Sequence, residues 1–220
     1  MKTKKNKSIK NILVVGGGIG GLETVRQLQL LSTKLNKPFR ITLLEKEARF
    51  GGRIQTIRTS PTTFYEGGAS RIAGCHTNVE KLIQLFHLKK KKCSNGESSE
   101  NSRKPLCNLF EKIKDTFLEK YDSHMLKQLT WYDILKESCE TEKEANDLVL
   151  KWGFTSIVLK LNAYDFWNVM HNYCVTKYYT LEGGLQSLPD ALVAHVQQNT
   201  NLITHTNSIL NSIQLNTNTN

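Results

Sequence analysis

The clearest pattern in the chain is an apolar run that ends in a cluster of glycines. Four β-prone residues at 12–15 are followed by glycines at 16, 18 and 21, the spacing G-x-G-x-x-G. Apolar residues then recur at helical spacing, at Leu22, Val25, Leu28, Leu31 and Leu35. The pattern predicts a strand, a tight turn and a helix over residues 11–36, followed by a break at 36–38 and a second strand at 39–44.

The order of strand, glycine turn, helix and strand is typical of a dinucleotide-binding site. In such a turn Gly16 permits the sharp bend, Gly18 lets the backbone approach a pyrophosphate, and Gly21 lets the helix pack closely on the strand. The phosphates would meet unpaired N–H groups and the positive end of the helix dipole. Glu45 follows the second strand, 24 positions after Gly21, close to the roughly 20 expected of an acid that binds a ribose hydroxyl.

The rest of the pattern predicts short strands and helices. Strand pieces are expected at 54–65, an amphipathic helix at 79–86, and a disordered loop over the lysines at 89–92 and the polar tract at 93–102. Residues 106–175 are predicted to be helical, with aromatic side chains that are more typical of a core than of a ligand cage. A helix with an apolar face at Leu188, Leu192 and Val196 follows, and then strands at 202–204 and 207–213.

These elements divide the chain into four parts. They are a basic disordered arm at 1–10, the first part of a nucleotide-binding domain at 11–87, a helical insert at 88–178 with a disordered loop at 88–105, and a return to the nucleotide-binding domain at 179–220. The predicted fold class is α/β, a doubly wound Rossmann-like domain with a mostly helical inserted domain.

Charge and cysteine content narrow the class of protein only slightly. The 220-residue chain has a formal net charge of +10, but its lysines gather at 2–10 and 89–92 without interleaved aromatics. A specific nucleic-acid site is therefore not expected. Five cysteines without C-x-x-C spacing favour reduced thiols in a cytoplasmic compartment, and no metal site is predicted. No apolar run approaches the ~18 residues of a membrane span.

Three further segments carry a resemblance to a known family. They are Ala48-Arg49-Phe50-Gly51-Gly52-Arg53, Tyr65-Glu66-Gly67-Gly68-Ala69-Ser70-Arg71-Ile72, and the Gly-Gly turn and helix at 181–192. With Glu45 they resemble the flavin-containing amine oxidase family, in which such turns surround FAD. Arg53 suits this role because a guanidinium offers forked donors to phosphate; taken alone, it is equally typical of a solvated surface arginine. The resemblance implies FAD contacts at Gly16, Gly18, Ile19, Gly20, Gly21, Glu45, Arg53, Gly68, Ala69 and Leu210, the last through its backbone beside the adenine.

Within that family, the turn before Arg71 is similar to one in the L-amino-acid oxidases. The resemblance implies that Arg71 binds the substrate carboxylate, for which a planar guanidinium is well suited; the alternative is an ordinary ion-paired arginine. The implied activity is FAD-dependent oxidation of a primary amine, most of all an L-amino acid, to an imine with dioxygen as acceptor. The resemblance gives no residue that acts as a general base.

The resemblance also sets an expectation about the length of the chain. The resemblance implies that the helical insert at 88–178 is a substrate domain. Family members continue beyond the equivalent of residue 220 with more of this domain and a second flavin segment, so the chain is expected to lack a carboxyl-terminal half. A second chain that completes the fold is then an expected partner, besides a small amine or amino acid. The alternatives are a degenerate remnant, a non-catalytic dinucleotide-binding module, and another superfamily member such as a polyamine oxidase or a desaturase-type oxidase.

Overall fold

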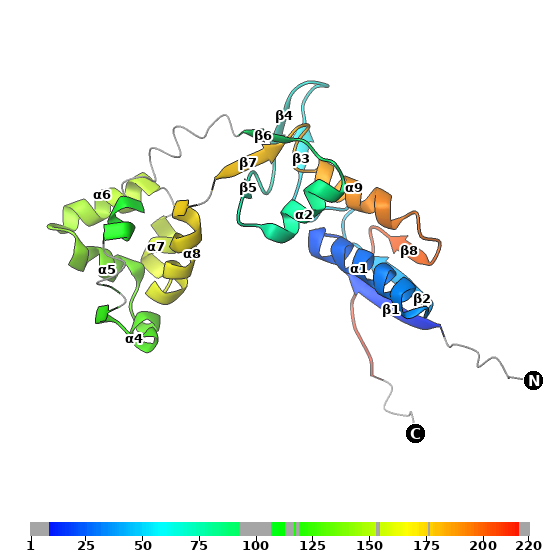
Figure 1. The fold of residues 1–220 in the computed structure, drawn as a ribbon, viewed down its shortest axis with the longest axis horizontal. Helices are drawn as coiled ribbons and strands as arrows, with labels where there is room; N and C mark the ends of the chain where they lie inside the picture. The colour runs from blue at the N-terminus through cyan, green and yellow to red at the C-terminus, as the bar shows by residue number, and fades with distance from the viewer. Residues whose placement is uncertain are drawn as a thin grey trace, which may run out of the picture. The chain divides into compact units, whose positions relative to one another are not determined.

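The chain forms two compact units (Figure 1). The computed structural model describes residues 9–92, 107–112, 117, 119–152, 155–175 and 177–215. Most of the predicted basic arm and of the predicted loop at 88–105 lies outside these residues. The first unit consists of Met1–Ile72, Thr77–Lys91 and Thr180–Asn220. The second unit consists of Ala73–His76 and Lys92–Tyr179.

The first unit contains a strand–helix–strand start and a helix–strand end. Its elements in chain order are β1 (Lys10–Val15), α1 (Ile19–Leu35), β2 (Phe39–Leu44), β3 (Thr56–Arg58), β4 (Phe64–Glu66), α2 (Thr77–Leu85), α9 (Ser187–Val196) and β8 (Leu202–His205). The antiparallel pair β3 and β4 forms a separate hairpin. These bounds agree with the predicted strands at 12–15, 39–44 and 202–204 and with the predicted helix at 79–86.

Three short strands form another sheet, in the order β5-β7-β6. They are β5 (Ile72–Ala73), β6 (Lys90–Lys92) and β7 (Tyr178–Leu181). The prediction of a loop over the lysines at 89–92 is therefore wrong for Lys90–Lys92. A lysine run has low strand propensity, and it becomes a strand here because a distant segment supplies its hydrogen-bond partners.

A parallel three-stranded sheet in the order β1-β2-β8 positions the candidate site. Strand β1 pairs with β2 over its whole length, and Ile41 to Leu44 of β2 pair with β8. Val14, Ile41 and Leu43 are buried on the same side. Since parallel strands end at one edge of a sheet, the turn after β1 and the residues after β2 are brought together there.

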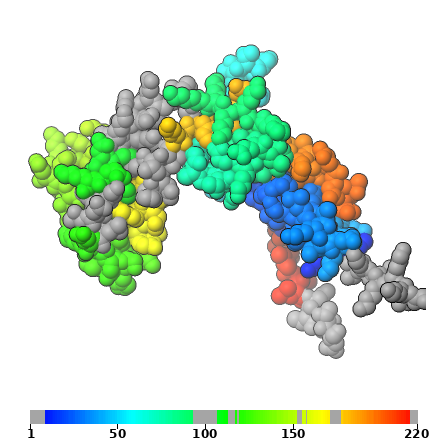
Figure 2. All heavy atoms as spheres, in the orientation of Figure 1, coloured from blue at the N-terminus to red at the C-terminus, as the bar shows by residue number. Residues whose placement is uncertain are grey.

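Helix α1 contacts this sheet and also contacts α9. Its Leu22 and Val25 are fully buried, and the side-chain amide of Gln29 donates a hydrogen bond to the Val196 carbonyl oxygen at 2.8 Å. In Figure 2 the blue α1 and the orange α9 lie side by side at the surface of the first unit. The predicted apolar face of α9 is buried, at Leu188, Leu192 and Val196.

Apolar side chains are exposed on the alternate positions of the same strands. The exposed fractions of Leu13, Val15 and Ile203 are 49%, 53% and 47%. Strand β1 lies at one end of the sheet order, and no strand of the described residues pairs with its outer edge. The first unit therefore presents both an apolar sheet surface and an open sheet edge.

The strand predicted at 207–213 is wrong, because residues 206–215 contain no strand. This segment instead folds onto the loop after β2, where the Asn207 N–H donates to the Glu47 carbonyl at 3.1 Å and the Ser208 N–H to the Glu45 carbonyl at 2.9 Å. Asn207 has a φ of +52°, which interrupts an extended conformation. Alternating apolar residues predict a strand only where a neighbouring strand is available to pair with it.

The second unit is mostly helical. Besides the helical residues 107–112, it contains α4 (Ser123–Gln128), α5 (Trp131–Ser138), α6 (Glu142–Trp152), α7 (Thr155–Lys160) and α8 (Ala163–Val175). Its core is rich in aromatic side chains: Trp131 stacks on Phe166 and Phe117 on Trp167, each with ring centroids 4.8 Å apart. A role for this unit as a substrate domain stays a prediction.

Local capping defines where α5 begins. The Thr130 hydroxyl accepts a hydrogen bond from the Asp133 N–H at 3.2 Å, and the Asp133 carboxylate accepts one from the Thr130 N–H at 3.0 Å. Hydrogen bonds from the Thr130 hydroxyl and backbone lower the pKa of Asp133. This reciprocal capping box satisfies N–H groups that a helix start otherwise leaves unpaired.

The cysteines depart from the predicted pattern. Cys75 and Cys139 carry free thiols, whereas Cys107 is disulfide-bonded. The prediction of reduced thiols is therefore wrong for Cys107, and the cytoplasmic compartment stays a prediction. In the part of the chain that the structure describes, no cluster of three or more His, Cys, Asp or Glu side chains could hold a metal, and no helix is long and apolar enough to span a bilayer.

Candidate functional site

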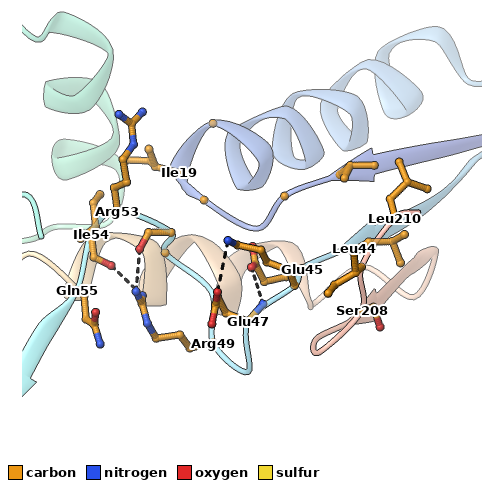
Figure 3. Close-up of a pocket in the computed structure, with 18 residues that line it drawn as sticks. Ile19, Leu44, Glu45, Glu47, Arg49, Arg53, Ile54, Gln55, Ser208 and Leu210 are labelled. Carbon is orange, nitrogen blue, oxygen red and sulfur yellow. Dashed lines mark hydrogen bonds and ion pairs between the residues drawn. The ribbon is translucent and has the colours of Figure 1, made fainter. Parts of the chain in front are cut away.

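A cavity of about 950 Å³ lies in the first unit where β1 and β2 end (Figure 3). It is lined by the turn between β1 and α1, the segment after β2, the turn at 51–55 and the residues after β8. Seven of the predicted FAD contacts line it: Gly16, Gly18, Ile19, Gly20, Glu45, Arg53 and Leu210. The fold thus brings four separate stretches of the predicted site into one cavity. Gly21, Gly68, Ala69 and Arg71 are not among the lining residues.

The turn between β1 and α1 leaves the start of the helix open to this cavity. Gly16 has a φ of +98°, a backbone conformation that glycine adopts without strain. The helix begins after Gly18, which provides no side-chain cap, and its first turn contains no acidic residue. The 17-residue helix α1 therefore presents uncapped N–H groups and the positive end of its dipole where Gly18, Ile19 and Gly20 line the cavity. Such a helix start suits an anionic group, and a phosphate in particular.

Glu45 is buried at the end of β2, with an exposed fraction of 4%. One carboxylate oxygen accepts the Gly17 N–H at 2.6 Å, and the other accepts the Glu47 N–H at 2.8 Å. The first of these hydrogen bonds ties the glycine turn to the end of β2, and the second orders the segment that follows β2. The carboxylate of this lining residue keeps further lone pairs, and a hydroxyl donor such as that of a ribose could use them.

The glycine turn at 16–18 and the one at 51–52 touch each other. The Gly51 N–H donates to the Gly17 carbonyl oxygen at 2.9 Å, and a Cβ on Gly52 would lie 3.2 Å from the Gly18 Cα. Gly51 and Gly52 have φ values of +115° and +59°. Glycine is needed at these positions for close backbone approach, in addition to any contact with a ligand.

Gly68 and Ala69 support Arg53 from outside the cavity. The Ala69 N–H donates to the Arg53 carbonyl oxygen at 2.9 Å, and a Cβ on Gly68 would lie only 2.0 Å from that oxygen. Figure 3 shows the Arg53 side chain extending toward Ile19, at the start of α1. The turn at 67–69 thus positions the backbone of a residue that lines the cavity, and the FAD contact predicted for Gly68 and Ala69 stays a prediction.

Three supporting residues were not predicted from the sequence. Gly17 lies between the glycines of the motif, and a Cβ there would lie 2.4 Å from a ring carbon of Phe50. The Gln186 side-chain amide donates to the Phe50 carbonyl oxygen at 3.2 Å, although the two are 136 residues apart. Arg49 hydrogen-bonds to carbonyl oxygens of the turn at 51–54. The Gly-Gly-Gly run in the sequence could have indicated the role of Gly17. No sequence pattern indicates Gln186, because only the tertiary fold brings it to Phe50.

Arg71, the predicted carboxylate-binding residue, lies elsewhere in the first unit. Its side chain is exposed and engaged in an interaction, and it does not line the cavity. The structure therefore does not bring Arg71 together with the seven predicted residues of the cavity, and its role stays a prediction.

Comparisons with known proteins agree with this geometry. Residues 14–86 match the model of the NAD(P)-binding Rossmann-like domain. An L-glutamate oxidase precursor from Streptomyces viridosporus is 36% identical over 95 residues, which are 38% of this chain and 13% of that protein. Polyamine oxidase 5 from Oryza sativa subsp. japonica is 34% identical over 96 residues, 43% of this chain and 18% of that protein.

A solved structure extends the similarity to most of the chain. An engineered triple mutant of putrescine oxidase aligns with a TM-score of 0.62 at 13% identity, over 89% of this chain and 50% of that one. The chain thus spans about half the length of this structural relative. At such low identity the alignment shows the fold.

The fold and the cavity define a Rossmann-like dinucleotide-binding domain of the α/β class, as predicted. The domain match and the oxidase relatives support the resemblance of the chain to the flavin-containing amine oxidase family.

Proposed function

We propose that the first unit binds FAD in the cavity at the ends of β1 and β2, and that the chain takes part in FAD-dependent oxidation of a primary amine, an L-amino acid in particular. The observation that carries the proposal is the contact between the two glycine turns beside buried Glu45 and the uncapped start of α1. It supplies a ribose acceptor and a phosphate-binding helix start in one cavity.

The donor set fits a dinucleotide with a pyrophosphate. Glu45 would accept ribose hydroxyls, while the start of α1 and Arg53 would meet the phosphates. Leu210, half-buried in the cavity lining, would lie beside the adenine. When bound, FAD would supply the group that accepts electrons from the amine.

The choice of substrate rests on Arg71. We expect Arg71→Ala to raise the KM for an L-amino acid by roughly tenfold to a hundredfold, because hydrogen bonds to a charged group contribute about 1.5–3 kcal/mol. The KM for a cationic polyamine, which has no carboxylate, should change little. The measurement is steady-state oxygen consumption by the FAD-loaded chain with each substrate, with Arg40→Ala as a control that removes an exposed arginine from β2. Equal effects of Arg71→Ala on both substrates would show that Arg71 does not select the carboxylate.

A second candidate function is a dinucleotide-binding module whose activity needs a second polypeptide. The exposed Leu13, Val15 and Ile203 and the open edge of β1 favour it, since an apolar sheet surface of this kind is usually covered in a working protein. Flavin that stays bound but is not bleached by an L-amino acid under nitrogen would support this candidate. Bleaching by the chain alone would contradict it.

A further inference from the structure

The turn that follows β2 contains two arginines with different surroundings. The Arg49 guanidinium is half-buried and donates to three backbone carbonyl oxygens: to Ile54 at 2.9 Å, to Gly52 at 2.8 Å and to Phe50 at 3.3 Å. Figure 3 shows that the Arg53 guanidinium extends toward Ile19, on the opposite side of the turn from that of Arg49. Of these two arginines, only Arg53 therefore extends its guanidinium toward the start of α1.

The Gly52 carbonyl that accepts from Arg49 determines where the next N–H group points, and the Gly51 carbonyl accepts from the Ile54 N–H at 3.1 Å. All peptide bonds described here are trans, so the Arg53 N–H is directed opposite to the Gly52 carbonyl, away from Arg49. No described residue accepts a hydrogen bond from the N–H of Gly52 or of Arg53. Both residues line the cavity. Successive free N–H groups in a turn of this kind form a concave site for an anion.

The turn needs such support because its glycines are conformationally permissive. Gly51 and Gly52 have positive φ values, and glycine loses more conformational freedom on folding than any other residue. The Gln186 side-chain amide donates a hydrogen bond to the Phe50 carbonyl, and the Gly51 N–H donates one to the Gly17 carbonyl. The Gly52 and Ile54 carbonyls accept side-chain hydrogen bonds from Arg49.

We infer that Arg49 is a positioning residue for the dinucleotide pyrophosphate. It fixes the 51–54 turn so that the free N–H groups of Gly52 and Arg53 face the phosphates, while Arg53 supplies the charge. The inference rests on the proposed dinucleotide site and assigns different tasks to two arginines that are four positions apart in the sequence.

Paired substitutions separate the two tasks. We expect Arg49→Lys and Arg49→Ala each to weaken FAD binding by roughly tenfold or more, because an ammonium cannot reach three carbonyls as a planar fork does. Arg53→Lys should lose less affinity than Arg53→Ala, since a lysine keeps a point charge for phosphate although it lacks the forked donors. The affinity is measured by titrating the full chain with FAD at several salt concentrations. Arg53→Ala should reduce the salt dependence of binding, and the Arg49 variants should leave it unchanged.

Hydrogen exchange of the FAD-free chain provides a readout that does not depend on the ligand. Amides at 50–54 should exchange faster in Arg49→Lys than in the unsubstituted chain, with no change in the helical amides of α1. The inference would be overturned if Arg49→Lys bound FAD as tightly as the unsubstituted chain, because a point charge would then be sufficient at position 49. It would also be overturned if the Arg49 variants lost as much salt dependence as Arg53→Ala. Either result would make Arg49 a phosphate ligand. If the unsubstituted chain binds no FAD, the proposed function fails. Unchanged exchange of the amides at 50–54 in Arg49→Lys would by itself reject the positioning role of Arg49.

Discussion

The substitution Gly21→Ala is expected to destabilise the first unit by at least about 2 kcal/mol and to abolish retention of a dinucleotide. A Cβ on Gly21 would lie 1.9 Å from the Gly16 carbonyl oxygen and 3.1 Å from its carbon. Both atoms belong to the backbone of the turn, so no side-chain rotation can relieve the clash. Helix α1 would have to move away from β1, and this would displace its start from the cavity.

Gly20 provides a matched control on the same helix. A Cβ on Gly20 meets nothing within 4 Å, and alanine is favoured over glycine in a helix by up to about 1 kcal/mol. Gly20→Ala should therefore leave stability unchanged or raise it. Urea unfolding of the ligand-free chain, followed by the circular dichroism signal, measures both variants. Equal stability of Gly21→Ala and Gly20→Ala would show that close packing of helix and strand does not depend on Gly21.

The second large effect is expected at Glu45. Replacing it with alanine removes the acceptors of the Gly17 and Glu47 N–H groups at a site that is 4% exposed. An unsatisfied buried donor costs about 1–3 kcal/mol and a part-buried one, such as the Glu47 N–H, costs less, so the loss of both acceptors should cost roughly 2–4 kcal/mol. Glu45→Ala should also lose FAD binding, because the ribose hydroxyls lose their acceptor.

Two further variants test whether the losses of stability and of FAD binding are specific to the Glu45 carboxylate. Glu45→Gln keeps one acceptor oxygen and should be less destabilised than Glu45→Ala, yet it should still bind FAD more weakly. Glu47→Gln removes a nearby exposed carboxylate from the same cavity lining and should have little effect on stability. Thermal unfolding with and without FAD measures these differences. A Glu45→Ala chain as stable as Glu47→Gln would contradict the role given to the two hydrogen bonds.

The parts of the fold that were predicted correctly depend on local sequence. The apolar run before Gly16, the helical spacing at Leu22 and Val25 and the strand that ends before Glu45 each reflect burial on one face of an element. Leu31 and Leu35, predicted on the same apolar face of the helix, are exposed. The spacing between Gly21 and Glu45 follows from one strand–helix–strand unit, so the sequence could place both near the same edge of the sheet. The cavity confirms that arrangement for Glu45 and the first glycine turn.

The parts that were missed depend on contacts between distant segments. Gln186 reaches the Phe50 carbonyl from 136 residues away, and Lys90–Lys92 form a strand only because β7 pairs with them. The segment at 207–213 has the alternation of a strand, but no strand in the described part of the chain pairs with it. Arg49 and Arg53 are of the same residue type in one turn, and only the directions of their side chains distinguish their tasks.

The most direct measurement is the visible absorption spectrum of the full chain after incubation with FAD and desalting. If the two glycine turns, Glu45 and the start of α1 form an FAD site, the desalted protein will retain flavin absorbance, and Gly21→Ala prepared in the same way will not. A colourless unsubstituted protein that is folded by circular dichroism would contradict the proposal that this unit binds FAD.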